Sequence, residues 1–122
     1  MKIITKFLVT FLTVFFIWSC NSDEVPTNDI TKNIVLKSGQ IYIYDFNILG
    51  DEEGATIITQ PKHADISEII RDATTNWSVV YRYKPVDGYT GSDSVEIKTC
   101  TGSDGTNCGE TKLYLIEFEI RN

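Results

Sequence analysis

The sequence predicts an all-β domain, a sandwich of about seven short strands. Apolar and polar residues alternate in several short segments, and a period of two places successive side chains on opposite faces of a strand. Turn-forming residues interrupt these segments every 8–12 residues or so, roughly the interval found in sandwiches. No segment keeps the period of about 3.6 residues that an amphipathic helix needs. A chain of 122 residues, 42% of them hydrophobic, suffices for one such domain.

Residues 1–19 are typical of a signal peptide. Lys2 and Lys6 precede an apolar run, residues 7–18, which is shorter than the roughly 18–20 residues of a membrane-spanning helix. The end of this run, Ile17-Trp18-Ser19-Cys20, resembles the lipobox of bacterial lipoproteins. The resemblance implies that Cys20 is diacylated and becomes the first residue of the mature chain. An ordinary secretory signal and a retained membrane anchor are the alternatives.

Residues 20–33 are predicted to be a flexible tether that begins at the lipidated cysteine, because they are polar and contain several turn formers. Asp23 and Glu24 resemble the export signal of surface lipoproteins in Bacteroidota. We therefore expect a protein anchored by lipid in the outer membrane and exposed at the cell surface, since two acyl chains give stable anchoring. A solvated acidic tether without export function, facing the periplasm, is the alternative.

The charge balance excludes nucleic acid as an expected partner. The formal net charge is −6, and it becomes −8 once the signal peptide, with its two lysines and no acid, is removed. Phosphate backbones are bound by clusters of basic residues, and the sequence has none. The expected contacts are the membrane, through the N-terminal lipid, and an unidentified protein or glycan. No cofactor is expected.

The domain is predicted over residues 34–122. Its strands are expected at residues 34–36, 40–48, 55–59, 64–70, 77–84, 94–99 and 111–120. The first of these is expected at a sheet edge. In the second, one face carries Tyr42, Tyr44, Phe46 and Ile48. Ile41 and Ile43 lie on the other face, so we expect the start of this strand to be covered on both sides.

The segment from residue 77 to residue 99 is predicted to be a strand, a long turn and a second strand. In the first strand, the residues expected to face the core are Trp77, Val79, Tyr81 and Tyr83. Pro85 ends this strand because proline cannot donate to a ladder, and glycines supply the turns that follow. In the later strands, the inward set is Val95, Ile97, Tyr114, Ile116, Phe118 and Ile120.

Four short pieces of this region occur together in a recognisable order. They are Gln60-Pro61-Lys62-His63, Tyr83-Lys84-Pro85, GYTGSDS at residues 88–94, and Cys100 with Cys108. In this order they resemble a bacterial cadherin-like or immunoglobulin-like repeat. The resemblance implies an immunoglobulin-like (cadherin-like) β-sandwich. Ala64 stands where the family usually has glycine, and one copy is present of a unit usually seen in tandem.

The cysteines predict one disulfide. If Cys20 carries lipid, Cys100 and Cys108 remain as a pair, and the cell envelope is oxidising. Their bond would close a glycine-rich loop between two strands and stabilise the fold by roughly 2–3 kcal/mol. Free thiols and zinc are the alternatives, although zinc would need two further ligands.

No metal site is expected, but five loop acids are weak calcium candidates. They are Asp51, Glu52, Glu53, Asp87 and Asp93. Calcium needs six to eight oxygen ligands, and acids solvated in loops are the alternative. His63, the only histidine, is expected to be a structural turn residue, and Trp77 is expected in the core rather than stacked on a sugar.

The sequence contains no GxSxG elbow and places no catalytic partner beside His63, so we expect no catalytic residues and a chain that is not an enzyme. The expected function is a non-catalytic binding or adhesion module for a protein or a glycan, by analogy with other sandwiches of this class. A structural or accessory subunit of an outer-membrane assembly is the first alternative, and a small envelope hydrolase is the second.

Overall fold

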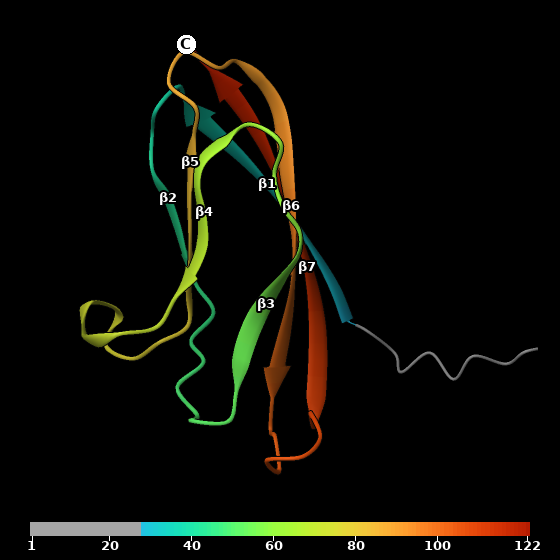
Figure 1. Ribbon diagram of the computed structural model, residues 1–122. Coiled ribbons are helices and arrows are strands. Elements are labelled where there is room, and N and C mark those ends of the chain that lie inside the picture. The colour runs from blue at the N-terminus through green and yellow to red at the C-terminus, as the bar shows by residue number, and fades with distance from the viewer. Residues whose placement is uncertain (1–27) are drawn as a thin grey trace, which may run out of the picture.

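The computed structural model describes residues 28–122, and the predictions for the signal peptide, for Cys20 and for the first part of the tether lie outside these residues. The described residues form seven strands and one short helical turn (Figure 1). These are β1 (Asn28–Lys37), β2 (Tyr42–Asp45), β3 (Gly54–Thr59), β4 (Ala64–Ile70), the 3-10 helix η1 (Ala73–Thr75), β5 (Val80–Pro85), β6 (Gly91–Thr101) and β7 (Glu110–Arg121). Between residues 28 and 122, no helix has the length and apolar character needed to cross a membrane.

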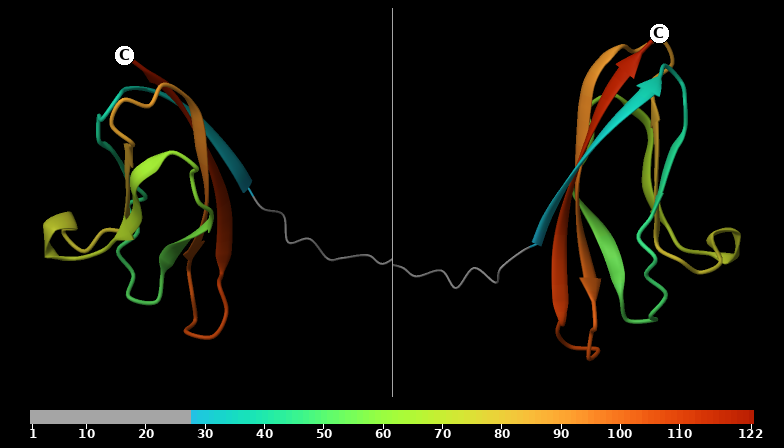
Figure 2. Two further views of the ribbon diagram at one scale, coloured as in Figure 1. Left: turned by 45° about the horizontal axis from the view of Figure 1, so that its top comes forward. Right: turned by 180° about the vertical axis from the view of Figure 1, so that it is seen from behind.

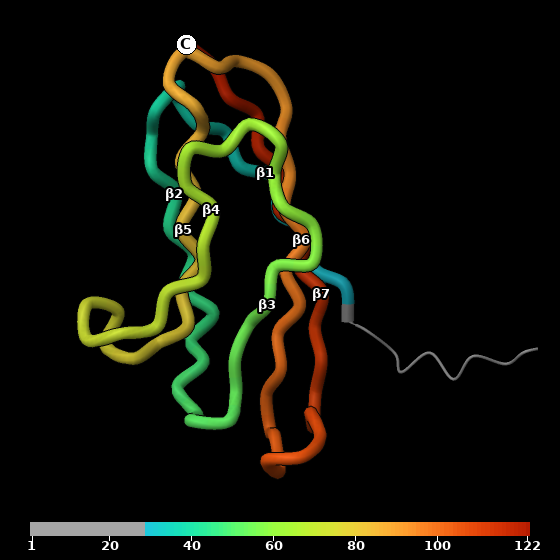
Figure 3. The backbone as a smooth tube through the Cα atoms, in the orientation of Figure 1, coloured from blue at the N-terminus to red at the C-terminus, as the bar shows by residue number. Residues whose placement is uncertain are grey.

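The strands form two sheets that pack face to face (Figure 2). One sheet has the order β1-β7-β6-β3 and the other the order β2-β5-β4. All neighbours are antiparallel except β1, which runs parallel to β7. The orders β3-β6-β7 and β2-β5-β4 correspond to strands C-F-G and B-E-D of an immunoglobulin sandwich. The predicted fold class is therefore confirmed. The chain crosses from one sheet to the other between β3 and β4 (Figure 3).

The first strand begins earlier than predicted. The tether was expected to continue to Asn33, but β1 starts at Asn28 and pairs with β7 in an unbroken register, from Asn28 opposite Lys112 to Lys37 opposite Arg121. The prediction was wrong here because β1 lies at a sheet edge, where polar residues facing solvent resemble a tether in composition. Ile30 nevertheless packs against the core.

The second strand is covered on one face, not on both. Phe46 and Ile48 are buried, whereas Ile41 is 51% and Ile43 is 63% exposed. Ile43 lies opposite Arg82 of β5, on the outer face of the three-stranded sheet. Nothing in residues 28–122 is packed over this face as a further layer, so the expected double cover is absent.

The core between the sheets consists of aromatic and branched aliphatic side chains. The inward residues predicted for β6 and β7 are all buried. The rings of Tyr83 and Phe118 stack with centroids 4.0 Å apart and planes 5° from parallel. Tyr42 meets Phe118 edge-on at 5.4 Å. The contact therefore joins β2, β5 and β7 across the two sheets, and offset or edge-on aromatic pairs add stability beyond their buried area.

Burial also changes the ionisation of two core tyrosines. It raises the pKa of Tyr81 to about 12, an effect that the hydrogen bond with Ser67 partly offsets. Burial, together with the hydrogen bond to Asp93, raises the pKa of Tyr83 well above its usual range. Both hydroxyls therefore stay protonated in the folded protein at a pH where the unfolded chain loses its phenolic protons.

We predict base-induced unfolding that begins near pH 10. Below that pH the contribution of the two tyrosines is fully present, since both states are protonated. Above it the unfolded chain binds fewer protons, and the free energy of unfolding falls by about 1.4 kcal/mol per tyrosine for each pH unit until the folded pKa is reached. Denaturant titrations between pH 8 and about 12 measure this slope. Tyr81→Phe should flatten it, and equal slopes in parent and variant would contradict the assignment.

Candidate functional site

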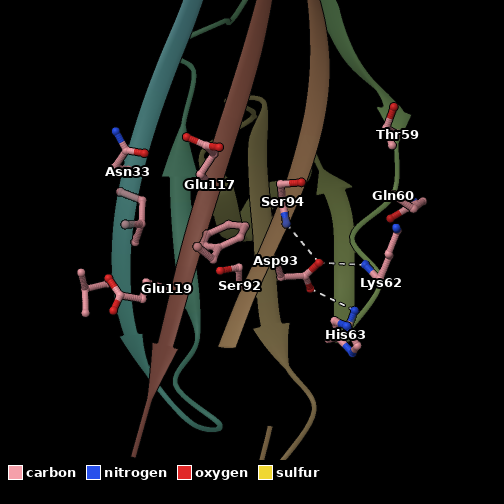
Figure 4. A pocket seen from close by; sticks show the side chains of 13 residues that line it. Asn33, Thr59, Gln60, Lys62, His63, Ser92, Asp93, Ser94, Glu117 and Glu119 are labelled. Atoms are coloured by element: carbon pink, nitrogen blue, oxygen red, sulfur yellow. Dashed lines mark hydrogen bonds between the residues drawn. The ribbon is translucent and has the colours of Figure 1, made fainter. Parts of the chain in front are cut away.

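A groove lies beside the first half of β6, where residues 92–94 line it (Figure 4). It has a volume of about 510 Å³ and is lined by β1, β7, β6 and the linker between β3 and β4. It forms because β3 pairs with β6 only as far as Thr59, which lies opposite Glu96. From Gly91 to Val95, β6 has β7 as its neighbour on one side, and no strand among residues 28–122 lies on the other.

Side chains take the place of the missing strand. The Asp93 carboxylate is 8% exposed and accepts hydrogen bonds from the backbone N–H groups of Lys62 at 2.8 Å, His63 at 3.0 Å and Ser94 at 3.0 Å. It also accepts one from the Tyr83 hydroxyl at 2.9 Å. These bonds join the β3–β4 linker, β5 and β6.

Tyr89 binds a further backbone group in this half of β6. Its hydroxyl donates to the backbone oxygen of Ser92 at 2.7 Å, and its ring stacks on His63 with centroids 4.0 Å apart. Tyr89 and Asp93 both belong to the GYTGSDS segment that suggested the family resemblance. In this chain, the segment therefore closes the free half of β6.

The groove brings His63, Asp93 and two serines together (Figure 4). However, the Asp93 carboxylate contacts the backbone of His63, and the imidazole lies flat against Tyr89. The backbone oxygen of His63 accepts from Val86 at 2.9 Å, so the residue joins the β3–β4 linker to the β5–β6 turn. This is the placement expected of a turn residue.

The five calcium candidates do not form one site. The Asp93 carboxylate already accepts four hydrogen bonds, and Asp87 forms an ion pair with Lys84 at 3.1 Å. The other three candidates lie at the opposite end of the sandwich (Figure 1), beside a hollow of about 620 Å³ next to the disulfide. There Glu53 accepts from the backbone N–H of Gly102 at 2.6 Å. Across residues 28–122, no three His, Cys, Asp or Glu side chains are placed to hold a metal ion.

The disulfide is confirmed. Cys100 and Cys108 are bonded, with their Cα atoms 5.5 Å apart, and they close the loop between β6 and β7.

The prediction for Trp77 is wrong. Val79, Tyr81 and Tyr83 are buried as expected, but the Trp77 side chain is 61% exposed. The strand begins only at Val80, because Asn76 and Trp77 have φ angles of 56° and 62° and break the alternation. Such left-handed conformations cost about 1–2 kcal/mol for residues with a β-carbon. The signal that the sequence offered was the asparagine before the tryptophan, since asparagine tolerates this conformation.

Arg71 holds this conformation in place, and its role was missed from the sequence. Its guanidinium donates to four backbone oxygens, those of Trp77 at 3.0 Å, Glu53 at 2.9 Å, Leu49 at 2.8 Å and Gly50 at 2.7 Å. It thus joins the β2–β3 and β4–β5 connections. Leu49 is 63% exposed beside it. We call residues 72–77 together with Leu49 the Trp77 surface.

The Trp77 surface lies far from the point where the chain enters the sandwich. It leaves the three-stranded sheet between β4 and β5, whereas Asn28 begins β1 in the other sheet. The views in Figures 1 and 2 agree that the η1 connection projects on the side opposite Asn28.

Comparison with known proteins gives little. No family model matches the chain, and no curated protein matches it. A solved structure that is similar is an endo-fucoidan hydrolase of glycoside hydrolase family 107, at 23% identity and a TM-score of 0.46. The match covers 75% of this chain and 13% of that chain.

The expectation that the chain is not an enzyme is corrected at this point, because the solved chain that it resembles is a hydrolase. We withdraw that expectation. A TM-score of 0.46 over 13% of that chain carries no statement about what this chain itself catalyses or binds.

We predict that Asp93→Ala lowers the free energy of unfolding by about 3–5 kcal/mol, because it leaves three N–H groups and one hydroxyl without their acceptor. Asp93→Asn should cost roughly half as much, since one oxygen remains. Chemical denaturation measures both. Ser92→Ala, on the same strand and exposed, is the matched control and should stay within about 0.5 kcal/mol of the parent. An equally stable Asp93→Ala would contradict the role given to this carboxylate.

Proposed function

We propose that this chain is a lipid-anchored module of the bacterial cell envelope that binds a glycan through the Trp77 surface. The observation that carries the proposal is the 61% exposure of Trp77 on a backbone that is strained and fixed. Strained residues persist where the surrounding structure enforces them, and they concentrate at functional sites. Here the Arg71 guanidinium enforces the conformation.

The chemistry around Trp77 fits a sugar ring. An indole offers a flat apolar face and one N–H donor, which suit the apolar face and the hydroxyl rim of a pyranose. Asp72, Thr74 and Asn76 are exposed on the same short turn. Hydrogen bonds from Thr74 lower the pKa of Asp72 below its usual range, so its carboxylate stays ionised as an acceptor. A protein interface needs about 800 Å² per partner, more than one tryptophan and one leucine on a turn offer.

The cellular address rests on the N-terminal pattern. The lipobox-like segment before Cys20 and the acids after it support an anchored chain at the outer surface of the outer membrane. The Cys100–Cys108 disulfide is consistent with an oxidising compartment. An anchor attached ahead of β1 would leave the Trp77 surface on the side of the sandwich away from the point of entry (Figure 2).

Trp77→Gly should abolish glycan binding without destabilising the fold. Glycine adopts a positive φ without strain, so we expect the free energy of unfolding to stay equal or to rise by up to about 1 kcal/mol. Binding is measured on a glycan array with the full chain in detergent, and stability by denaturant titration. Trp77→Phe, which keeps an aromatic face, is the matched control and should retain part of the binding.

Two outcomes would contradict the glycan assignment. One is an array on which the folded parent gives no signal. The other is Trp77-dependent capture of an envelope protein, which would identify a protein partner or an accessory role in an outer-membrane assembly.

Cys20→Ala should release the chain from membranes into the soluble envelope fraction, because the acylated sulfur is lost. Mass spectrometry of the parent should find a mature N-terminus at Cys20 carrying acyl chains. Protease treatment of intact cells should digest the domain at the surface. An unmodified N-terminus would contradict the anchor, and a protected domain would place it on the periplasmic face.

A further inference from the structure

One long strand edge stands open in this sandwich. β1 pairs with β7 along one side over ten residues without a bulge. Within the part of the chain that the structure describes, no strand lies along its other side, as the view from behind in Figure 2 shows. Such an edge is a template for pairing with another chain.

The other edges of residues 28–122 are blunted. β2 has four residues, and the pairings of β3 and β4 are both interrupted by register shifts. Asp93 and Tyr89 close the part of β6 that β3 leaves unpaired, residues 91–95. Short length, bulges and covering groups are the usual means by which proteins prevent unwanted pairing. Over the described residues, β1 is long and unbroken, and such cover is seen only at its last residue, Lys37, whose outward groups bond to Gln40.

The open backbone groups of β1 belong to its odd-numbered residues. Ser38 donates to the Arg121 oxygen at 2.8 Å, so Ser38 and the residues at steps of two before it face β7. The N–H and C=O of Lys37 point the other way, and both bond to Gln40. By the same alternation, the groups of Asp29, Thr31, Asn33 and Val35 face the open side.

We propose that the open edge of β1 binds β1 of a second copy of this chain. The two strands run antiparallel with Asn33 on the two-fold axis, and they join two four-stranded sheets into one. The outward-facing residues then meet as Asn33 with Asn33 and as Thr31 with Val35 on either side. Asp29 of each copy lies opposite Lys37 of the other copy.

Charge selects this register. With Asn33 on the axis, opposite charges meet twice on the exposed face, and Ile30 lies opposite Leu36 on the inner face. Moving the axis by one residue to Lys32 would place two lysines directly opposite each other, which is unfavourable. Moving it by one residue to Ile34 would leave Asp29 without a partner on the strand. The strand is therefore self-complementary in one pairing, as a two-fold interface requires.

Cysteine cross-linking in the full chain tests the register. Asn33→Cys should form a disulfide-linked dimer under mild oxidation, since residues opposite each other in a hydrogen-bonded pair have Cα atoms about 5.5 Å apart, which a disulfide can span. Thr31→Cys is the matched control. In the proposed register its two copies lie about 13 Å apart along the strands and should not cross-link. Thr31→Cys combined with Val35→Cys should restore the cross-link.

Charge exchange tests the same pairing without cysteine chemistry. Sedimentation equilibrium of the full chain in detergent should show a dimer whose dissociation constant rises about tenfold in Asp29→Lys, where like charges meet at two places. Combining Asp29→Lys with Lys37→Asp should return the constant to near that of the parent.

Asn33→Pro separates pairing from folding. It removes an N–H that faces the open side and leaves the ladder with β7 intact, so circular dichroism should be unchanged while the dimer is lost. The proposal is overturned if the folded parent stays monomeric at the highest concentration reached, even if the edge captures a strand of another protein. It is also overturned if Thr31→Cys alone cross-links as well as Asn33→Cys does.

Discussion

The Asp93 carboxylate joins three parts of the sandwich that no strand ladder connects. Because β3 leaves β6 at Thr59 to reach the other sheet, half of β6 would otherwise present unpaired backbone groups to solvent. One buried anion satisfies two N–H groups of the linker, one of its own strand and a tyrosine hydroxyl of β5. A buried charge is stable only when donors surround it, so the carboxylate and the crossover depend on each other.

At the other end of the sandwich, the Arg71 guanidinium also joins separate parts of the chain. It donates hydrogen bonds to four backbone carbonyl oxygens of the β2–β3 and β4–β5 connections. Arginine suits this task because its donors form a rigid planar fork and keep their charge at every relevant pH. These hydrogen bonds stabilise the backbone conformation that places Trp77 outside the core. If the alternation of β5 had continued back to Trp77, its indole would have been buried, so the Arg71 contacts favour an exposed indole.

The hydrogen bonds of Asp93 and Arg71 determine which parts of the sandwich are covered and which remain exposed. Polar side chains complete the loops and the broken edge of β6, whereas within residues 28–122 the outer edge of β1 is regular and is covered only at Lys37, by Gln40. Trp77 on its fixed turn and the outer edge of β1 are therefore two exposed features of the described residues that these side chains do not close. The Trp77 turn leaves the three-stranded sheet and β1 belongs to the four-stranded sheet, so a ligand at Trp77 and a second copy at β1 can be bound at the same time.

The sequence by itself determined the strands and their inward faces, because a period of two in residues such as Ile97, Tyr114, Ile116 and Phe118 records burial on one side. It also indicated the disulfide, since two cysteines remained to pair. Only the tertiary structure decided the start of β1, the exposure of Trp77 and the roles of Asp93 and Arg71. The edge strand β1 is held in place by its pairing with β7. Asp93 and Arg71 each bind backbone groups that lie far away along the chain. Such long-range contacts leave no period in the sequence.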